Sequence, residues 1–425
     1  CQMNEYDTEL IRSILLAAGY SFVDSIQDVE VVLFNTCSVR EHANDVVYNK
    51  IHKAKKCRMP PPIIGVLGCI ATHSGKALLD NKRLNVDFLA GPDSYRKLPE
   101  LIRNAFAGQK KKMDISLSVH ENYEDILPAR VPGVNAWVAV TRGCNNFCSF
   151  CVVPYARGRE RSRPVESILH EVTELVKQGF KQVTLLGQNV NSYKFEKKDF
   201  TYLLEQVAEI KGIERIRFMS PHPKDFPDSL IETTASNPKI CNHFHLPLQS
   251  GNDRILKIMN RCYTRKDYLS LVEKIRKKIP EIVLTTDVIV GFPTETDVEF
   301  EDTFSLMEEV QFDSAFIFKY SPREGTAAMK KYNDDITDEK KTERIVRLNH
   351  LQKKKSIEKN KAYIGKTESV LIEEVSTKKS PHDFQGRTDG NKLAIFPACP
   401  GKIGDFINVK ITDATANVLK GEVVS

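Results

Sequence analysis

Three cysteines lie close together in the stretch "TRGCNNFCSFCVVPYARGRERSR". Cys144, Cys148 and Cys151 are separated by three residues and then by two. A zinc site would need a fourth Cys or His nearby, and the next histidine, His170, falls in a predicted helix. A disulfide would use two thiols and leave one over. Three thiolates with one open corner suit a cubane [4Fe–4S] cluster whose fourth iron binds another ligand, although spacing alone leaves zinc or a structural role open.

Three further cysteines fall at junctions between predicted strands and helices. Cys37 ends the apolar run "VEVVLFNTC", Cys69 follows "IIGVLG", and Cys1 precedes the predicted helix in "NEYDTELIRSILLAAG". Ligands collect at the carboxyl ends of the strands in open α/β sheets, so these thiols can converge. Buried cysteines acting as small hydrophobic side chains are the alternative. The remaining cysteines match no motif and are expected to be structural: Cys57, Cys241, Cys262 and Cys399.

The elements that must position these cysteines predict three domains joined by a linker. Residues 1–110 alternate short apolar runs with helical segments, which predicts an α/β domain with an open parallel sheet. Residues 111–130 are charged and irregular, as is typical of a linker. Residues 131–360 contain six strand candidates separated by helical segments, which predicts a partial (β/α)6 barrel with its chemistry at the carboxyl ends of the strands. Short strands and turns in residues 361–425 predict a small antiparallel β-barrel.

The composition is that of a folded protein with a mild excess of positive charge. The 425 residues are 41% hydrophobic, and the net charge is +6, which is compatible with a nucleic-acid partner. We see no signal peptide and no apolar run of bilayer length, so we expect a cytoplasmic protein whose cysteines serve metal binding or catalysis. Because the first residue is Cys1, we expect a short segment to precede it in the natural protein.

The three-cysteine loop, with Phe150 before its last cysteine and a β/α barrel around it, resembles the radical S-adenosylmethionine (SAM) superfamily. The resemblance implies that Cys144, Cys148 and Cys151 hold a [4Fe–4S] cluster whose open iron chelates SAM. It also implies that "LLGQN" faces the SAM amino group, "HLPLQSG" its ribose or methionine part, and "DVIVGFP" its adenine. For these three segments, ordinary strand and turn structure is the alternative. The implied cofactor-binding residues are Phe150, Gly187, Gln188, Gln249, Ser250, Asp287, Val288 and Ile289.

The N-terminal motifs "CQMNEYDTE", "NTCSVRE" and "GCIAT" resemble the methylthiotransferases within that superfamily. This implies that Cys1, Cys37 and Cys69 hold a second, auxiliary [4Fe–4S] cluster, also with a free iron site. The C-terminal barrel resembles the TRAM domain, a small RNA-binding fold. The resemblance thus covers nearly the whole chain.

The resemblance implies a transferase that uses two molecules of SAM. One donates a methyl group to a sulfur on the auxiliary cluster, and the other yields a 5′-deoxyadenosyl radical that removes a substrate hydrogen. Branches of the family modify a ribosomal-protein aspartate, threonylcarbamoyl-adenosine in tRNA, or N6-isopentenyladenosine at tRNA position 37. "GCNNFCSFCVVPYARGRERSR" and "GQNVNSY" look most like the third branch, the MiaB type. The implied partners are tRNA and a flavodoxin or ferredoxin electron donor, and we expect a monomer. The alternative from another class is a non-catalytic zinc-dependent RNA-binding protein.

Basic residues agree with an RNA substrate, because phosphate contacts by Lys and Arg dominate affinity for nucleic acids. One arginine of the cysteine loop is also a candidate for a bidentate contact with the SAM carboxylate. A second group, Lys353, Lys354 and Lys355, precedes the terminal barrel, and a solvated helix face is its alternative. The predicted RNA-binding residues beside the cysteine loop are Arg157, Arg159, Arg161 and Arg163.

Overall fold

The computed structural model describes residues 1–37, 42–377 and 380–424, and the chain forms two compact units. Unit 1 consists of residues 1–131, 139–167 and 321–330, and unit 2 of residues 132–138, 168–320 and 331–425. Each unit therefore combines segments that are far apart in the sequence. In the described part of the chain, we find no helix that combines the length and the apolar character needed to span a bilayer.

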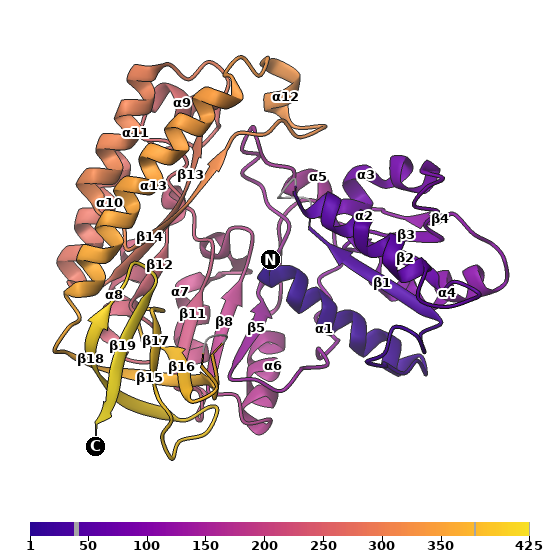
Figure 1. Ribbon diagram of the computed structural model, residues 1–425, viewed down its shortest axis with the longest axis horizontal. Helices are drawn as coiled ribbons and strands as arrows, with labels where there is room; N and C mark the ends of the chain where they lie inside the picture. The colour runs from indigo at the N-terminus through magenta and orange to yellow at the C-terminus, as the bar shows by residue number, and fades with distance from the viewer. Residues whose placement is uncertain (38–41, 378–379, 425) are drawn as a thin grey trace. The chain divides into compact units, whose positions relative to one another are not determined.

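Unit 1 is built on a parallel four-stranded sheet with the order β1-β2-β3-β4, which confirms the predicted open parallel sheet (Figure 1). The fourth strand differs from the expectation, because it lies inside the stretch predicted as an irregular linker and pairs with β3. Tyr123 of the same stretch is fully buried. Because this stretch is rich in charged residues, its sequence pattern did not indicate the short edge strand. The strands are β1 (Val31–Thr36), β2 (Ile63–Gly68), β3 (Phe88–Ala90) and β4 (Lys112–Asp114).

Helices cover both faces of this sheet. Leu10 and Leu15 of α1 (Gln2–Ala17) pack with Leu98 and Leu101 of α4 (Leu98–Phe106) in one hydrophobic cluster. The second cluster joins α2 (His42–Lys55) and α3 (Cys69–Asp80) to the other face of the sheet. Apolar side chains are needed on both faces, which explains why these strands read as continuous apolar runs rather than alternating ones.

Unit 2 contains the six strands of the predicted partial barrel (Figure 1). They form two three-stranded sheets with the orders β11-β8-β5 and β12-β13-β14, and a parallel bridge between Ile216 and Ile240 continues from β11 toward the second sheet. The pairs β8–β11, β12–β13 and β13–β14 are parallel. The strands are β5 (Asn135–Ala139), β8 (Gln182–Leu186), β11 (Arg215–Phe218), β12 (His243–His245), β13 (Val283–Val290) and β14 (Ser314–Lys319).

Amphipathic helices separate these strands, as expected for β/α connections. Two of them, α10 and α11, begin with a complete capping box, in which a Thr side chain and an acidic side chain satisfy each other's backbone N–H groups. The helices are α6 (Val165–Lys177), α7 (Phe200–Ala208), α8 (Asp228–Ser236), α9 (Asp253–Ile258), α10 (Arg265–Lys278), α11 (Asp297–Val310) and α13 (Asp338–Lys361).

The C-terminal strands of unit 2 close into a five-stranded barrel with the order β15-β16-β17-β19-β18. The predicted antiparallel barrel is confirmed with one correction, because β17 and β19 pair in parallel. Arg217 of β11 anchors this barrel by donating hydrogen bonds to the carbonyl oxygens of Thr388 and Asp389, both at 2.7 Å. The strands are β15 (Thr367–Glu374), β16 (Asp383–Arg387), β17 (Leu393–Pro397), β18 (Phe406–Ala414) and β19 (Val418–Val424).

Candidate functional site

The loop of Cys144, Cys148 and Cys151 is closed at its base by two short paired strands, β6 (Thr141–Arg142) and β7 (Arg161–Ser162). Gly143 begins the loop with a positive φ of 80°, and the Cys144 amide donates to the Gly158 carbonyl at 3.1 Å. Cys144 and Cys148 are buried, and Cys151 is half-buried. The loop is therefore a defined turn that gathers three thiols into one short segment of unit 1.

The N-terminal cysteines belong to the same unit. Cys1 caps the N-terminus of α1 and is exposed, Cys37 follows β1 and is half-buried, and Cys69 is the buried first residue of α3. Residues 38–41 of the motif "NTCSVRE" lie outside the described residues. The structure thus places all three at element junctions, two of them at the carboxyl ends of neighbouring strands β1 and β2, as the sequence predicted.

Arg157 connects the two cysteine sets. It is the last residue of α5 (Val153–Arg157), the short helix that follows Cys151. Its Nε donates to Cys69 Sγ at 3.1 Å, and its Nη2 donates to Asn4 Oδ1 at 3.0 Å. Asn4 Oδ1 also accepts from the Cys1 thiol at 3.3 Å. Burial raises the pKa of the Cys69 thiol, and the Arg157 guanidinium acts in the opposite direction.

A buried carboxylate completes this contact. Asp7 is fully buried and pairs with Arg142 at 2.9 Å and with Arg157 at 2.8 Å. Burial alone would raise its pKa, but the two guanidiniums hold the pKa of Asp7 below its ordinary value. Sequence reasoning missed Asn4, Asp7 and Arg142. The available signal was two polar residues on the face of α1 that also buries Leu10, since a polar residue on an apolar helix face needs a partner.

Three of the four loop arginines predicted to bind RNA are buried inside unit 1. Arg157, Arg161 and Arg163 are 3%, 8% and 1% exposed. Arg161 forms an ion pair with Asp93 at 2.9 Å, and Arg163 donates to the Tyr6 hydroxyl and to the Ala139 carbonyl. Their charges are committed to contacts inside unit 1. Arg159 is exposed and lies over the Phe147 ring. It is the member of the four whose placement in unit 1 leaves it open to a phosphate.

In unit 2, two of the segments predicted to bind SAM, "HLPLQSG" and "DVIVGFP", come together at the carboxyl-terminal half of β13. The Gln249 amide donates to the Asp287 carbonyl at 2.8 Å, and the Ile289 amide donates to the Gln249 carbonyl at 2.9 Å. "HLPLQSG" therefore continues the parallel pairing beside Val288. His245, which sequence reasoning did not single out, places its Nε2 at 3.2 Å from Asp287 Oδ2.

Gly187 and Gln188 directly follow β8, and both are half-buried. The Gln188 Oε1 atom is buried and accepts no hydrogen bond from the described residues. An unsatisfied buried acceptor indicates a donor that the chain alone does not supply. Phe150 is half-buried in the cysteine loop, and Ser250 is buried with its hydroxyl 3.3 Å from the Thr303 hydroxyl.

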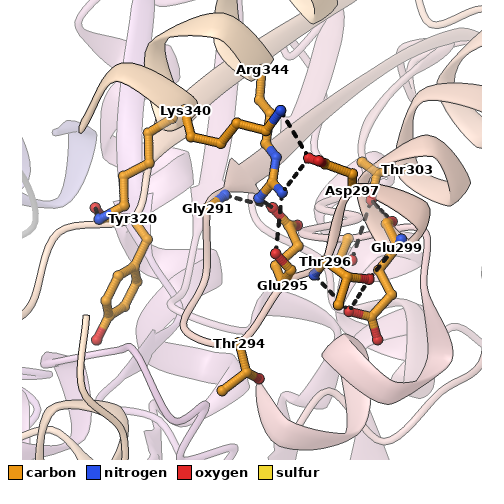
Figure 2. Close-up of polar contacts among 12 residues, drawn as sticks. Gly291, Thr294, Glu295, Thr296, Asp297, Glu299, Thr303, Tyr320, Lys340 and Arg344 are labelled. Carbon is orange, nitrogen blue, oxygen red and sulfur yellow. Dashed lines mark hydrogen bonds and ion pairs between the residues drawn. The ribbon is translucent and has the colours of Figure 1, made fainter. Parts of the chain in front are cut away.

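The turn after β13 is fixed by a buried arginine (Figure 2). Arg344 of α13 donates to Glu295 Oε2 at 2.6 Å and to Asp297 Oδ1 at 2.9 Å. The Gly291 amide donates to the same Glu295 oxygen at 2.7 Å. Gly291 has a positive φ of 68°, which glycine adopts without strain. These bonds hold the end of the "DVIVGFP" strand in place.

Two buried polar atoms of residues in or next to the cysteine loop have no hydrogen-bond partner in the described part of the chain. Arg157 Nη1 and Ser149 Oγ are buried and make no hydrogen bond to a described residue. Among the described residues, no three His, Cys, Asp or Glu side chains converge closely enough to bind one metal ion. The unsatisfied Arg157 donor lies on a guanidinium that contacts Cys69, which fits an acceptor such as sulfur in a group bound at this cysteine set.

Comparisons with known proteins match three family models along the chain. Residues 1–91 match the uncharacterized protein family UPF0004, residues 138–307 match the radical SAM superfamily, and residues 361–424 match the TRAM domain. Curated relatives named tRNA-2-methylthio-N(6)-dimethylallyladenosine synthase align over the full chain. The relative from Bacteroides fragilis is 46% identical over 100% of this chain and 94% of its own length. The relative from Porphyromonas gingivalis is 47% identical over 100% and 93%.

The chain belongs to the tRNA-2-methylthio-N6-dimethylallyladenosine synthase family. Solved structures support the fold at lower identity. The radical SAM methyltransferase TsrM from Kitasatospora setae, with cobalamin and a [4Fe–4S] cluster bound, aligns with a TM-score of 0.59 at 15% identity, covering 76% of this chain and 74% of that one. The cobalamin-dependent radical SAM enzyme OxsB aligns with a TM-score of 0.51 at 13% identity, covering 81% and 53%. Membership of this family implies [4Fe–4S] clusters and SAM as cofactors.

Proposed function

We propose that the protein converts N6-isopentenyladenosine at position 37 of tRNA to its 2-methylthio derivative. The observation that carries the proposal is the full-length identity of 46% to synthases named for this product. The matches to radical SAM and TRAM models agree with a radical transferase that acts on RNA. The structure adds two cysteine sets in one unit, joined by Arg157.

The proposed ligands are Cys144, Cys148 and Cys151 for the radical SAM cluster and Cys1, Cys37 and Cys69 for the auxiliary cluster. When bound, these clusters supply one-electron reduction of SAM and the sulfur that is transferred, with one SAM consumed for the methyl group and one for the radical. The protein provides thiolate ligands, hydrogen bonds to them, and a position for each substrate. No acid–base pair is required, because the adenine C2–H bond has no useful acidity.

Residues of unit 2 would orient SAM. Gln188 Oε1, a buried acceptor without a donor among the described residues, would accept a hydrogen bond from the SAM ammonium. Val288 and Ile289 would line the adenine, and Gln249, which is hydrogen-bonded between Asp287 and Ile289, would face the ribose or methionine part. Gly187 and Ser250 are proposed to complete this set in unit 2. Phe150, in the cysteine loop of unit 1, is proposed as a further cofactor-binding residue.

We also propose residues 1–110, 131–360 and 361–425 as functional domains. Residues 111–130 are proposed to link the first two, and they also contribute β4 to the sheet of unit 1. The electron donor is proposed to be a flavodoxin or ferredoxin, and the enzyme is proposed to act as a monomer. A tRNA substrate supports a cytoplasmic location for this activity.

The test is nucleoside mass spectrometry of tRNA from a host that lacks its own methylthiotransferase. Expression of this protein should produce 2-methylthio-N6-isopentenyladenosine at the expense of N6-isopentenyladenosine. Variants Cys144→Ala and Cys69→Ala should both leave N6-isopentenyladenosine unmodified, whereas Cys262→Ala, at an exposed cysteine outside both sets, should be active. Unmodified tRNA with the wild-type protein, together with a methylthiolated ribosomal protein or a threonylcarbamoyl product, would reject the proposed substrate.

Iron content separates the cluster assignment from a zinc-binding alternative. Anaerobic reconstitution should give a brown protein with about eight irons per chain, as two cubanes require. Cys144→Ala should lose SAM cleavage, and Cys69→Ala should keep SAM cleavage and lose methylthio transfer. A colourless, zinc-loaded protein would contradict the assignment.

A further inference from the structure

Arg157 touches one proposed auxiliary-cluster ligand directly and a second through a single intermediate. The guanidinium donates to Cys69 Sγ, and through Asn4 Oδ1 it is linked to the Cys1 thiol. Its backbone ends α5, the helix that begins two residues after Cys151. This one side chain therefore links the segment that follows Cys151 to Cys69 and, through Asn4, to Cys1.

The charged side chains around Arg157 leave a net positive charge beside Cys69. Arg142, Asp7 and Arg157 form a buried chain of two cations and one anion, with a net charge of +1. The Tyr95 hydroxyl donates to Asp7 and adds no charge at neutral pH. The neighbouring Arg161 is paired with Asp93, so that pair is neutral. A buried charge without a counter-charge is costly, and an anionic group bound beside Cys69 would offset the excess.

The guanidinium also has a donor to spare. Nε and Nη2 are used by Cys69, Asn4 and Asp7, while Nη1 is buried without an acceptor among the described residues. Buried donors in native proteins are nearly always satisfied. Sulfur bound next to Cys69 would supply an acceptor that the chain itself lacks.

We propose that Arg157 is a positioning residue of the auxiliary site. It keeps Cys69 and Cys1 in place as ligands and raises the reduction potential of the cluster bound there. A hydrogen bond and a positive charge at a ligand sulfur both stabilise the more negative, reduced state of a cluster. This inference rests on the proposed function, because it takes Cys1, Cys37 and Cys69 as cluster ligands.

The inference is tested on a protein that holds only the auxiliary cluster. Replacing Cys144, Cys148 and Cys151 together by Ala leaves a background expected to bind about four irons per chain. In this background, the midpoint potential is measured by a redox titration followed by electron paramagnetic resonance. Arg157→Met removes the charge and the donors, and Arg157→Lys keeps the charge without the guanidinium fork. Arg159→Met is the matched control, since it removes an exposed arginine two residues away that contacts no cysteine sulfur.

We expect Arg157→Met to shift the midpoint potential to a more negative value, Arg157→Lys to shift it less in the same direction, and Arg159→Met to leave it unchanged. If Arg157→Met keeps four irons and has the same midpoint potential as the background protein, the inference is overturned. If Arg157→Met does not fold, Arg157→Lys decides on the same measurement, because Asp7 then keeps a cation on both sides. A background protein without iron would instead refute the auxiliary-ligand assignment of the proposed function.

Discussion

Glu295 and Arg344 form a buried ion pair in unit 2, with Oε2 and Nη1 2.6 Å apart and side chains that are 1% and 3% exposed. The pair joins the turn after β13 to α13 (Figure 2). Glu295 belongs to the turn that ends the strand proposed to line the SAM adenine, so its protonation state bears on the stability of that part of the site.

The Glu295 carboxyl should make the stability of the protein fall as pH rises from about 4.5 to about 7. Burial raises its pKa from 4.5 to about 7, and the hydrogen bonds from Gly291 and Arg344 only partly oppose this. Between these two pH values the folded chain binds the Glu295 proton more tightly than the unfolded chain does. The stabilisation that this proton gives is therefore present below pH 4.5 and lost above pH 7. The full effect is about 3 kcal/mol. The measurement compares the melting temperatures of the wild type and Glu295→Gln at pH 5 and at pH 7.5. The wild type should lose melting temperature relative to the variant at the higher pH.

Glu299→Gln is the matched control for this measurement. The hydrogen bond from Arg254 lowers the pKa of Glu299 to about 2, so Glu299 stays ionised throughout the window. The melting temperature of Glu299→Gln should therefore differ from the wild type by the same amount at both pH values. A pH-independent difference for Glu295→Gln would show that Glu295 does not titrate there.

Gly143→Ala should prevent the radical SAM cluster from binding. Gly143 has a positive φ of 80°, and an added Cβ would overlap the Arg159 carbonyl on the opposite side of the loop. The loop must open to admit the methyl group, which moves Cys144. We expect about four irons per chain instead of about eight, and loss of SAM cleavage.

Gly108→Ala controls for the backbone conformation alone. Gly108 also has a φ of 80°, but an added Cβ there meets no atom within 4 Å. The substitution should cost about 1–2 kcal/mol and leave the iron content at the wild-type value. Equal iron content in the two variants would mean that the close approach at Gly143 is not needed for cluster binding.

Arg217→Lys should loosen the C-terminal barrel. Arg217 donates to the Thr388 and Asp389 carbonyls, and a lysine cannot reach both with the geometry of a guanidinium. Loss of one charged hydrogen bond costs about 1.5–3 kcal/mol, so hydrogen exchange in β16 and β17 should accelerate. Lys366→Met is the control, because it removes an exposed ion pair with Glu281 that contributes at most about 1 kcal/mol. Equal exchange in the two variants would contradict the anchoring role.

Most strands of the two parallel parts of the fold were predicted from the sequence because they are apolar runs bounded by turn residues. The sequence also placed Cys37 and Cys69 at strand ends, which follows from the βα alternation alone. It did not predict the partners of the arginines. Whether Arg161 meets a phosphate or Asp93 depends on a contact between residues 68 positions apart, and local pattern carries no information on it. Edge strand β4 was missed because the run of lysines that leads into it resembles a linker.

Lys353 and Lys354 provide the remaining test of RNA contact. Both are exposed on α13, whereas Lys355 is half-buried and lies 3.5 Å from Glu358. If both exposed lysines meet phosphates, the double variant Lys353→Ala/Lys354→Ala should bind tRNA more weakly. The slope of log K against log salt should also become shallower by about 1.5–2, because tRNA binding releases fewer counterions when two phosphate contacts are missing. Lys355→Ala should leave the slope close to the wild-type value, since its charge is already paired. An unchanged slope in the double variant would mean that these lysines are a solvated helix face, and Arg159 would then be the stronger candidate for phosphate contact.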